Sequence, residues 1–215
     1  MFTYSLAGLQ LDDAQSAPAV PIEENETTAR SAVYQVLGRL VTPPDVDHFE
    51  KAGDGRWAKE LAEAAELLPF SVELADPGLG DDVTVGQYQE AFEAVTGGDK
   101  LRASVNVQSG LDEVARFYEY FGLGVAEGGL ASDHLATECD FLQFVTYKEA
   151  AAQSPRLQTS FRRAQLDFLE RHLRLWVPTL AAAVAAADTL PFFAWTIDLV
   201  ERFTAADHAY LQSLG

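Results

Sequence analysis

Apolar side chains recur at the three- and four-residue spacing of amphipathic helices along most of the chain. The first such helix is expected to begin at Thr27 or Thr28 and to stop before Pro43. Further helices are predicted after Asp45 and at residues 57–68, 84–97, 111–121, 133–152, 157–177, 190–203 and 207–214. No alternating run is long enough to indicate a strand. The pattern therefore predicts an all-α helical bundle of roughly nine to eleven helices.

The chain length of 215 residues suits one domain. Residues 1–26 are polar and contain prolines, so we expect a flexible N-terminal tail followed by one all-helical domain at residues 27–215. Pro178 is expected to end the helix at 157–177, because proline removes a backbone donor and clashes with the preceding turn. The glycine-rich segment at 122–131 leaves a two-part arrangement of the helical domain open.

The charge balance narrows the class of partner. With 33 acidic and 15 basic residues, the net charge of −18 argues against nucleic acid, because little here would displace counterions from phosphate. It favours basic partners, although an acidic surface also serves solubility alone. No apolar run reaches about 18 residues, so no membrane insertion is expected. The first basic residue is Arg30, so no export signal is indicated and we expect a cytoplasmic protein.

A polar cluster stands where the helix at 133–152 begins. Asp133 is placed to accept hydrogen bonds from the free backbone N–H groups of the first helical turn. His134 and Glu138 are four residues apart, which predicts that they project from the same helix face. Tyr118 and Tyr120 belong to an aromatic stripe that is mostly core, yet tyrosines there could also line a groove beside the cluster. The cluster either satisfies itself or meets a partner.

Motifs for catalysis are missing from the sequence. It has no nucleophile elbow, phosphate-binding loop, dinucleotide fingerprint or zinc-protease motif. The single Cys139 excludes an intrachain disulfide and a cysteine-rich zinc site. We therefore expect no enzymatic activity, no cofactor and no bound metal. Two alternatives stay open: a hydrolase or metal-dependent enzyme that uses the His134/Glu138 pair, and a permanent helical subunit or adaptor.

Five stretches, in order along the chain, carry a resemblance to a known family. They are residues 30–40 (RSAVYQVLGRL) before a proline pair, 88–92 (YQEAF) before two glycines, 117–123 (FYEYFGL), 133–141 (DHLATECDF) and 172–178 (HLRLWVP). Their types and order resemble the TorD/DmsD/NarJ group of cytoplasmic chaperones that mature molybdenum-containing oxidoreductases. The chain departs from the family pattern at Ala131, where a proline is frequent, and at residues 101–105.

The resemblance implies a TorD-like helical bundle and a chaperone function. Such chaperones bind the twin-arginine signal peptide of a client, hold its apo catalytic subunit and assist cofactor insertion before export. The family places Asp133 and His134 at the peptide-binding site, and geometry alone adds Glu138 and Tyr118. The expected partners are a molybdoenzyme catalytic subunit and its signal peptide; a homo-oligomer is left open. An acidic rim beside an apolar floor suits such a peptide, which joins a basic stretch to an apolar one.

Overall fold

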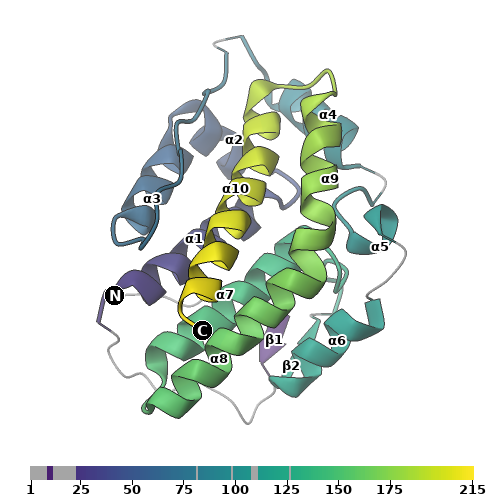
Figure 1. Ribbon diagram of the computed structural model, residues 1–215. Helices are drawn as coiled ribbons and strands as arrows, with labels where there is room; N and C mark the ends of the chain where they lie inside the picture. The colour runs from purple at the N-terminus through teal and green to yellow at the C-terminus, as the bar shows by residue number, and fades with distance from the viewer. Residues whose placement is uncertain (1–8, 12–22, 81, 98, 108–110, 126) are drawn as a thin grey trace.

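The chain forms an α-helical bundle with one small pair of strands (Figure 1). The computed structural model describes residues 9–11, 23–80, 82–97, 99–107, 111–125 and 127–215. Its helices are α1 (Glu26–Leu40), α2 (Val46–Gly53), α3 (Arg56–Ala65), α4 (Val85–Thr96), α5 (Ala103–Asn106), α6 (Leu111–Tyr120), α7 (Leu135–Ala151), α8 (Pro155–Phe168), the π-helical η2 (Leu169–Leu173), α9 (Arg174–Ala185) and α10 (Pro191–Ser213). The all-α prediction is confirmed. None of the described helices is long and apolar enough to cross a membrane.

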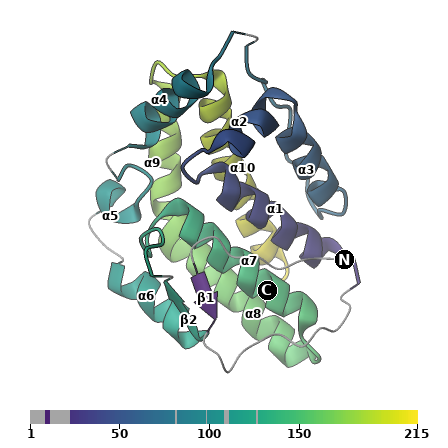
Figure 2. The same ribbon diagram turned by 180° about the vertical axis from the view of Figure 1, so that it is seen from behind.

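Helix α7 is the centre of the bundle. Every residue from Leu135 to Thr146 is buried, which agrees with the wide apolar face of this segment in the sequence. It packs chiefly against α1 and α8. Figure 1 shows α10 and α9 side by side on the near face, and the reverse view of Figure 2 shows α1 and α7 on the other face. A helix enclosed by neighbours in this way holds the start of its first turn in a fixed position for the site described below.

The C-terminal helices differ from the sequence prediction at two places. Pro178 does not end a helix but lies inside α9. Helix α9 directly follows the π-helical η2, whose wider turn includes a bond from Arg174 N–H to Leu169 O. Helix α10 is continuous, whereas two helices, 190–203 and 207–214, were predicted. The hydroxyl of Thr204 donates to Val200 O at 2.8 Å, so its polar group is satisfied within the helix.

Two N-terminal caps confirm the sequence reading and one corrects it. Asp45 caps α2 through its bond from His48 N–H, and Thr84 caps α4 in a capping box with Gln87. The cap of α1 is Asn25, not Thr27 or Thr28, and Thr28 closes the box from inside the helix. The earlier start follows from the amide oxygen of Asn25, which accepts the backbone N–H groups of both threonines.

A short antiparallel pair of strands lies beside α6 and α7 (Figure 2). Strand β1 (Leu9–Leu11) pairs with β2 (Leu123–Val125), with Leu9 opposite Val125 and Leu11 opposite Leu123. Three residues per strand are too few to show alternation, which is why the sequence did not indicate them. The expected tail, residues 1–26, lies mostly outside the described residues, and its division from a domain at 27–215 stays a prediction.

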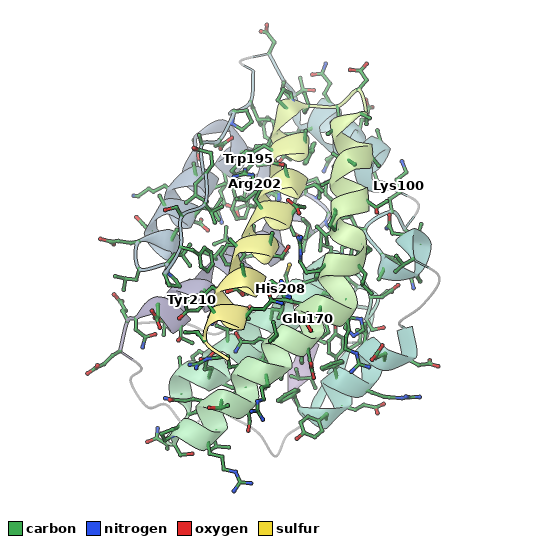
Figure 3. All side chains as sticks on the ribbon, in the orientation of Figure 1. Lys100, Glu170, Trp195, Arg202, His208 and Tyr210 are labelled. Atoms are coloured by element: carbon green, nitrogen blue, oxygen red, sulfur yellow. The ribbon has the colours of Figure 1, made fainter. Side chains whose placement is uncertain are left out.

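Buried polar side chains tie four helices together. Arg30 of α1 bonds to Asp207 of α10, to Gln165 of α8 and, at 3.4 Å, to Glu149 of α7. Tyr34 donates to Asp207 at 2.7 Å. We call these five residues the Arg30 network. Nearer the surface, His208 of α10 lies 3.1 Å from Glu170 of η2, and both are labelled in Figure 3.

Candidate functional site

Two separate segments meet at the start of α7. Residues 101–104 lie antiparallel to residues 133–135, with a bridge between Arg102 and His134. Backbone N–H groups close the pairing: Ala103 donates to Asp133 O at 2.9 Å and Leu135 donates to Leu101 O at 2.8 Å. Because the pairing joins the start of α5 to the segment that leads into the buried helix α7, it fixes the backbone of Asp133 and His134.

Asp133 is fully buried, and its side chain bonds to the neighbouring segment at residues 102–104 instead of to its own helix. Its carboxylate accepts Arg102 Nε at 2.9 Å and the backbone N–H of Ser104 at 2.9 Å. Burial raises the pKa of this carboxyl, but the bonds from Ser104 and the Arg102 charge outweigh it, and the net pKa is lowered. The expectation that Asp133 caps α7 is therefore wrong, since its oxygens are taken by partners that lie about thirty positions earlier in the chain.

His134 caps α7. Its Nδ1 accepts the backbone N–H of Ala136 at 3.1 Å, so the ring is neutral with its proton on Nε2. Burial lowers the pKa of His134 to about 4, which keeps this neutral form at physiological pH. Within the described residues, nothing bonds to Nε2. This N–H belongs to a half-buried side chain.

Glu138 and Tyr118 lie inside the protein. Glu138 accepts Trp176 Nε1 at 3.2 Å, and its second oxygen has no partner among the described residues. Burial raises the pKa of Glu138 well above its usual range. Tyr118 donates to Ser132 O at 2.8 Å and holds the approach to the cluster. Both side chains therefore support the site from behind.

The spacing argument for a His134/Glu138 pair does not hold in this structure. His134 precedes α7 with an extended backbone, at φ −78° and ψ 140°, so the four-residue rule for one helix face does not apply to it. His134 is half-buried, whereas Glu138 is enclosed against Trp176. Over the described ranges, no group of three or more His, Cys, Asp or Glu side chains is arranged to hold a metal ion.

Arg102 is the member of this cluster that the sequence did not reveal. It lies 31 positions before Asp133, and no local spacing connects the two residues. A second ion pair at 3.4 Å joins Arg102 to Asp99, whose backbone adopts the left-handed conformation at φ 70°. In the resulting row of Asp99, Arg102, Asp133 and His134, both carboxylates are ion-paired to Arg102. His134 Nε2, at the end of the row, has no partner within the described residues.

Two grooves of opposite charge lie elsewhere on the surface. One, of about 430 Å³, runs between α1 and α3 and is lined by Glu24, Glu60, Glu63 and Glu66; we call it the acidic groove. The other, of about 750 Å³, lies between α6, α7 and α8; we call it the cationic groove. Tyr120 lines the cationic groove and Tyr118 does not. The aromatic stripe thus divides between surface and core.

Comparison with known proteins places the chain in a family. A family model described as nitrate reductase delta subunit matches residues 102–182, which include Arg102, Asp133 and His134. The perchlorate reductase assembly chaperone protein of Dechloromonas aromatica (strain RCB) is 34% identical over 200 residues, which cover 85% of this chain and 89% of that one. The selenate reductase assembly chaperone protein of Thauera selenatis is 36% identical over 75% of this chain and 79% of its own length. For the chlorate reductase assembly chaperone protein of Ideonella dechloratans the identity is 32%, with the same two shares, 75% and 79%.

These similarities define a class of helical assembly chaperones for reductases. The chain belongs to the TorD/NarJ-like family of redox enzyme maturation chaperones.

Proposed function

We propose that this chaperone binds the twin-arginine signal peptide and the apo catalytic subunit of a molybdenum-containing oxidoreductase in the cytoplasm, and assists cofactor insertion before export. The observation that carries the proposal is the similarity to reductase assembly chaperones along most of both chains. The client of this chain is left as a class of enzyme, because those relatives are named for different reductases.

Within that function, His134 is the residue that we propose contacts the signal peptide. Its Nε2–H is unpartnered within the described residues and suits a backbone carbonyl of an extended peptide. Asp133 acts by holding Arg102 and the paired backbone of residues 101–104 in place. Glu138 and Tyr118 position this corner from inside, so their replacement alters peptide binding only through the backbone they support.

The acidic groove supports the same proposal from another face. Four glutamates line it, and so do Ala32, Val36 and Leu67, the last of which is 46% exposed. Arg39 also lines it and is ion-paired to Glu60. Over the described residues, Glu24 and Glu66 form no ion pair, so their carboxylates are free to meet arginine forks. A peptide that joins arginines to an apolar stretch matches both features of this groove.

We further propose that the protein has no turnover of its own and needs no bound metal. Glu138 is a buried acid held by Trp176, which removes it from contact with a substrate. Stoichiometric zinc or iron in protein purified without added metal, and lost in a His134→Ala variant, would contradict this proposal and favour the metal-dependent alternative.

Affinity capture tests the proposed function. The tagged chaperone is recovered from its native cytoplasm, and the proteins that accompany it are identified by mass spectrometry. We expect a large molybdenum oxidoreductase that still carries a twin-arginine leader, and a synthetic copy of that leader should bind the purified chaperone. A second synthetic leader with both arginines replaced by glutamine is the control and should bind more weakly. Equal binding of the two leaders would contradict the proposal.

A further inference from the structure

The cationic groove has an aromatic floor. Phe117 and Phe121 come from the α6 region, Phe144 from α7 and Phe161 from α8. The rings of Phe121 and Phe161 lie 6.0 Å apart, and those of Phe121 and Phe144 lie 6.4 Å apart. Three helices therefore converge on one apolar surface. Its volume of about 750 Å³ is large enough to receive several side chains of a partner.

The charged residues that line this groove are mostly basic, whereas the molecule as a whole is acidic. Arg116, Lys148, Arg163 and Arg171 line it, against only Glu113 and Asp167. The whole chain has 33 acidic and 15 basic residues, so the excess of basic residues around this groove differs from the composition of the rest of the protein. Arg171 is ion-paired to Glu113.

The other three rim cations are available. In the part of the chain that the structure describes, Arg116, Lys148 and Arg163 form no ion pair with a carboxylate. Lys148 lies over the ring of Phe144, 5.3 Å from its centroid, and desolvation lowers its pKa. A lysine held against an apolar surface in this way gains when an acidic partner arrives.

Large apolar side chains also stand exposed at the edges of the groove. Tyr120 is 82% exposed and Leu157 is 49% exposed, on the α6 side and the α8 side respectively. Exposed apolar residues that adjoin an aromatic floor and a charged rim are typical of an interaction surface. The surface is thus suited to a partner that is apolar in the middle and acidic at its flanks.

We propose that the cationic groove docks an apolar segment with flanking carboxylates from the mature part of the client's catalytic subunit. The inference rests on the proposed chaperone function and adds a second contact to it. A twin-arginine leader is basic and would be repelled by Arg116, Lys148 and Arg163, so it does not fit this groove. The leader and the mature subunit would therefore occupy different faces of the chaperone at the same time.

The form of the groove favours a polypeptide over a small anion. Its unpaired cations come from three different helices, Arg116 from α6, Lys148 from α7 and Arg163 from α8. Its aromatic residues lie in or directly after helical turns, where backbone N–H groups are already bonded, as for Phe121 N–H to Tyr118 O. The groove thus offers apolar area with peripheral charge, which matches an amphipathic segment.

Charge reversal tests the docking of an acidic segment. The probes are a synthetic helical peptide with a leucine and phenylalanine stripe flanked by glutamates, and a twin with lysines in place of the glutamates. We expect the Lys148→Glu/Arg163→Glu variant to bind the glutamate peptide at least about tenfold more weakly than the wild-type chaperone does. Its affinity for the lysine twin, whose charge suits the acidic groove, should not fall. Equal affinity of the two proteins for the glutamate peptide would overturn the proposal.

Helix α8 provides a matched control. Arg156 and Arg163 are both exposed on this helix, but only Arg163 lines the groove. Arg163→Glu should weaken the glutamate peptide several-fold more than Arg156→Glu, although the two variants have the same net charge. Equal losses would show a general charge effect and refute a site at the groove. If a nucleoside triphosphate binds the wild-type protein, loses affinity in the Lys148→Glu/Arg163→Glu variant, and the glutamate peptide does not bind, the groove is a small-anion site and the proposal is wrong.

The leader and the leaderless catalytic subunit separate this proposal from the proposed function. Lys148→Glu/Arg163→Glu should bind the leader at least as well as wild type, and should lose most of its affinity for the captured catalytic subunit after its leader is removed. Failure of the wild-type protein to bind any leader would count against the proposed function alone. Retention of the leaderless subunit by the double variant would overturn the docking groove alone.

Discussion

Two polar clusters of this chaperone differ in how far water is excluded from them. In the Arg30 network, the side chains of Arg30, Asp207 and Glu149 are 1%, 0% and 3% exposed, and each charge has a partner inside the protein. In the Arg102–Asp133–His134 cluster, Asp133 is equally buried, but the Arg102 side chain is 26% exposed and His134 Nε2 has no partner in the described residues. A closed network contributes to the fold alone, whereas an open one can also contact a ligand.

The largest expected effect is on the closed network. Arg30→Met should lower the free energy of unfolding by about 3–5 kcal/mol, because it leaves Asp207 and Glu149 as buried charges with fewer partners. Arg39→Met on the same helix is the control, with an expected loss of about 1 kcal/mol, since its pair with Glu60 is partly exposed to solvent. Urea unfolding measures both. Similar losses in the two variants would refute the structural role of the Arg30 network.

A smaller loss of stability is expected in the open cluster. Asp133→Asn should cost about 1–3 kcal/mol, because it removes a charged acceptor from Arg102 and Ser104 but keeps the shape of the side chain. Leader affinity should fall in this variant and should not fall in folded Arg30→Met. If Arg30→Met, compared at a temperature where both variants are folded, loses leader binding as strongly, the two clusters do not differ in function.

Acidic pH should lower stability through the histidines. Burial lowers the pKa values of His48, His134 and His172 to about 4, while an unfolded histidine titrates near pH 6.5. The unfolded chain therefore binds more protons between these values, so stability falls as pH drops from about 6.5 to about 4. Melting temperatures across this window should decline, and His134→Gln should decline less steeply. The raised pKa of Glu138 acts in the opposite direction, so Glu138→Gln should steepen the decline.

The weakest effect is expected from salt. A surface of net charge −18 attracts a basic leader over a range that salt shortens to about 8 Å at physiological ionic strength. Leader affinity should therefore fall several-fold between low and high salt, while the apolar part of the leader keeps some binding. Equal dissociation constants at the two salt concentrations would exclude an electrostatic role for the acidic surface.

The sequence indicated most helices because their apolar spacing and capping residues are local signals. Asp45, Thr84 and the buried run at Leu135–Thr146 were each readable within one turn or one helix. The Arg30 network was not readable, because Asp207 lies 177 positions from Arg30 and no periodic pattern links them. The same limit explains Arg102 as the partner of Asp133. The cap of α1 was missed for a local reason, because two candidate threonines stand within three residues of Asn25.

The sequence predicted where these side chains gather better than it predicted how deeply each one is buried. Asp133, His134, Glu138 and Tyr118 do gather at the start of α7, through bonds that involve Ser132 and Trp176. Their depths differ because His134 lies outside the helix as its cap, while Glu138 lies a full turn inside it. A spacing rule reports which residues share a face but does not report which part of that face neighbouring helices cover. Their role in peptide binding stays a prediction.

Melting and leader binding measured on the same Asp133→Ala, His134→Ala and Glu138→Ala proteins test the central claim most directly. Loss of the His134 cap should cost about 1 kcal/mol, which a domain of this size survives. We predict that Asp133→Ala and His134→Ala stay folded and lose leader binding, and that Glu138→Ala shows a smaller loss of binding in the same direction. Binding that persists in all three variants while their melting temperatures drop sharply would contradict the account and make the cluster structural.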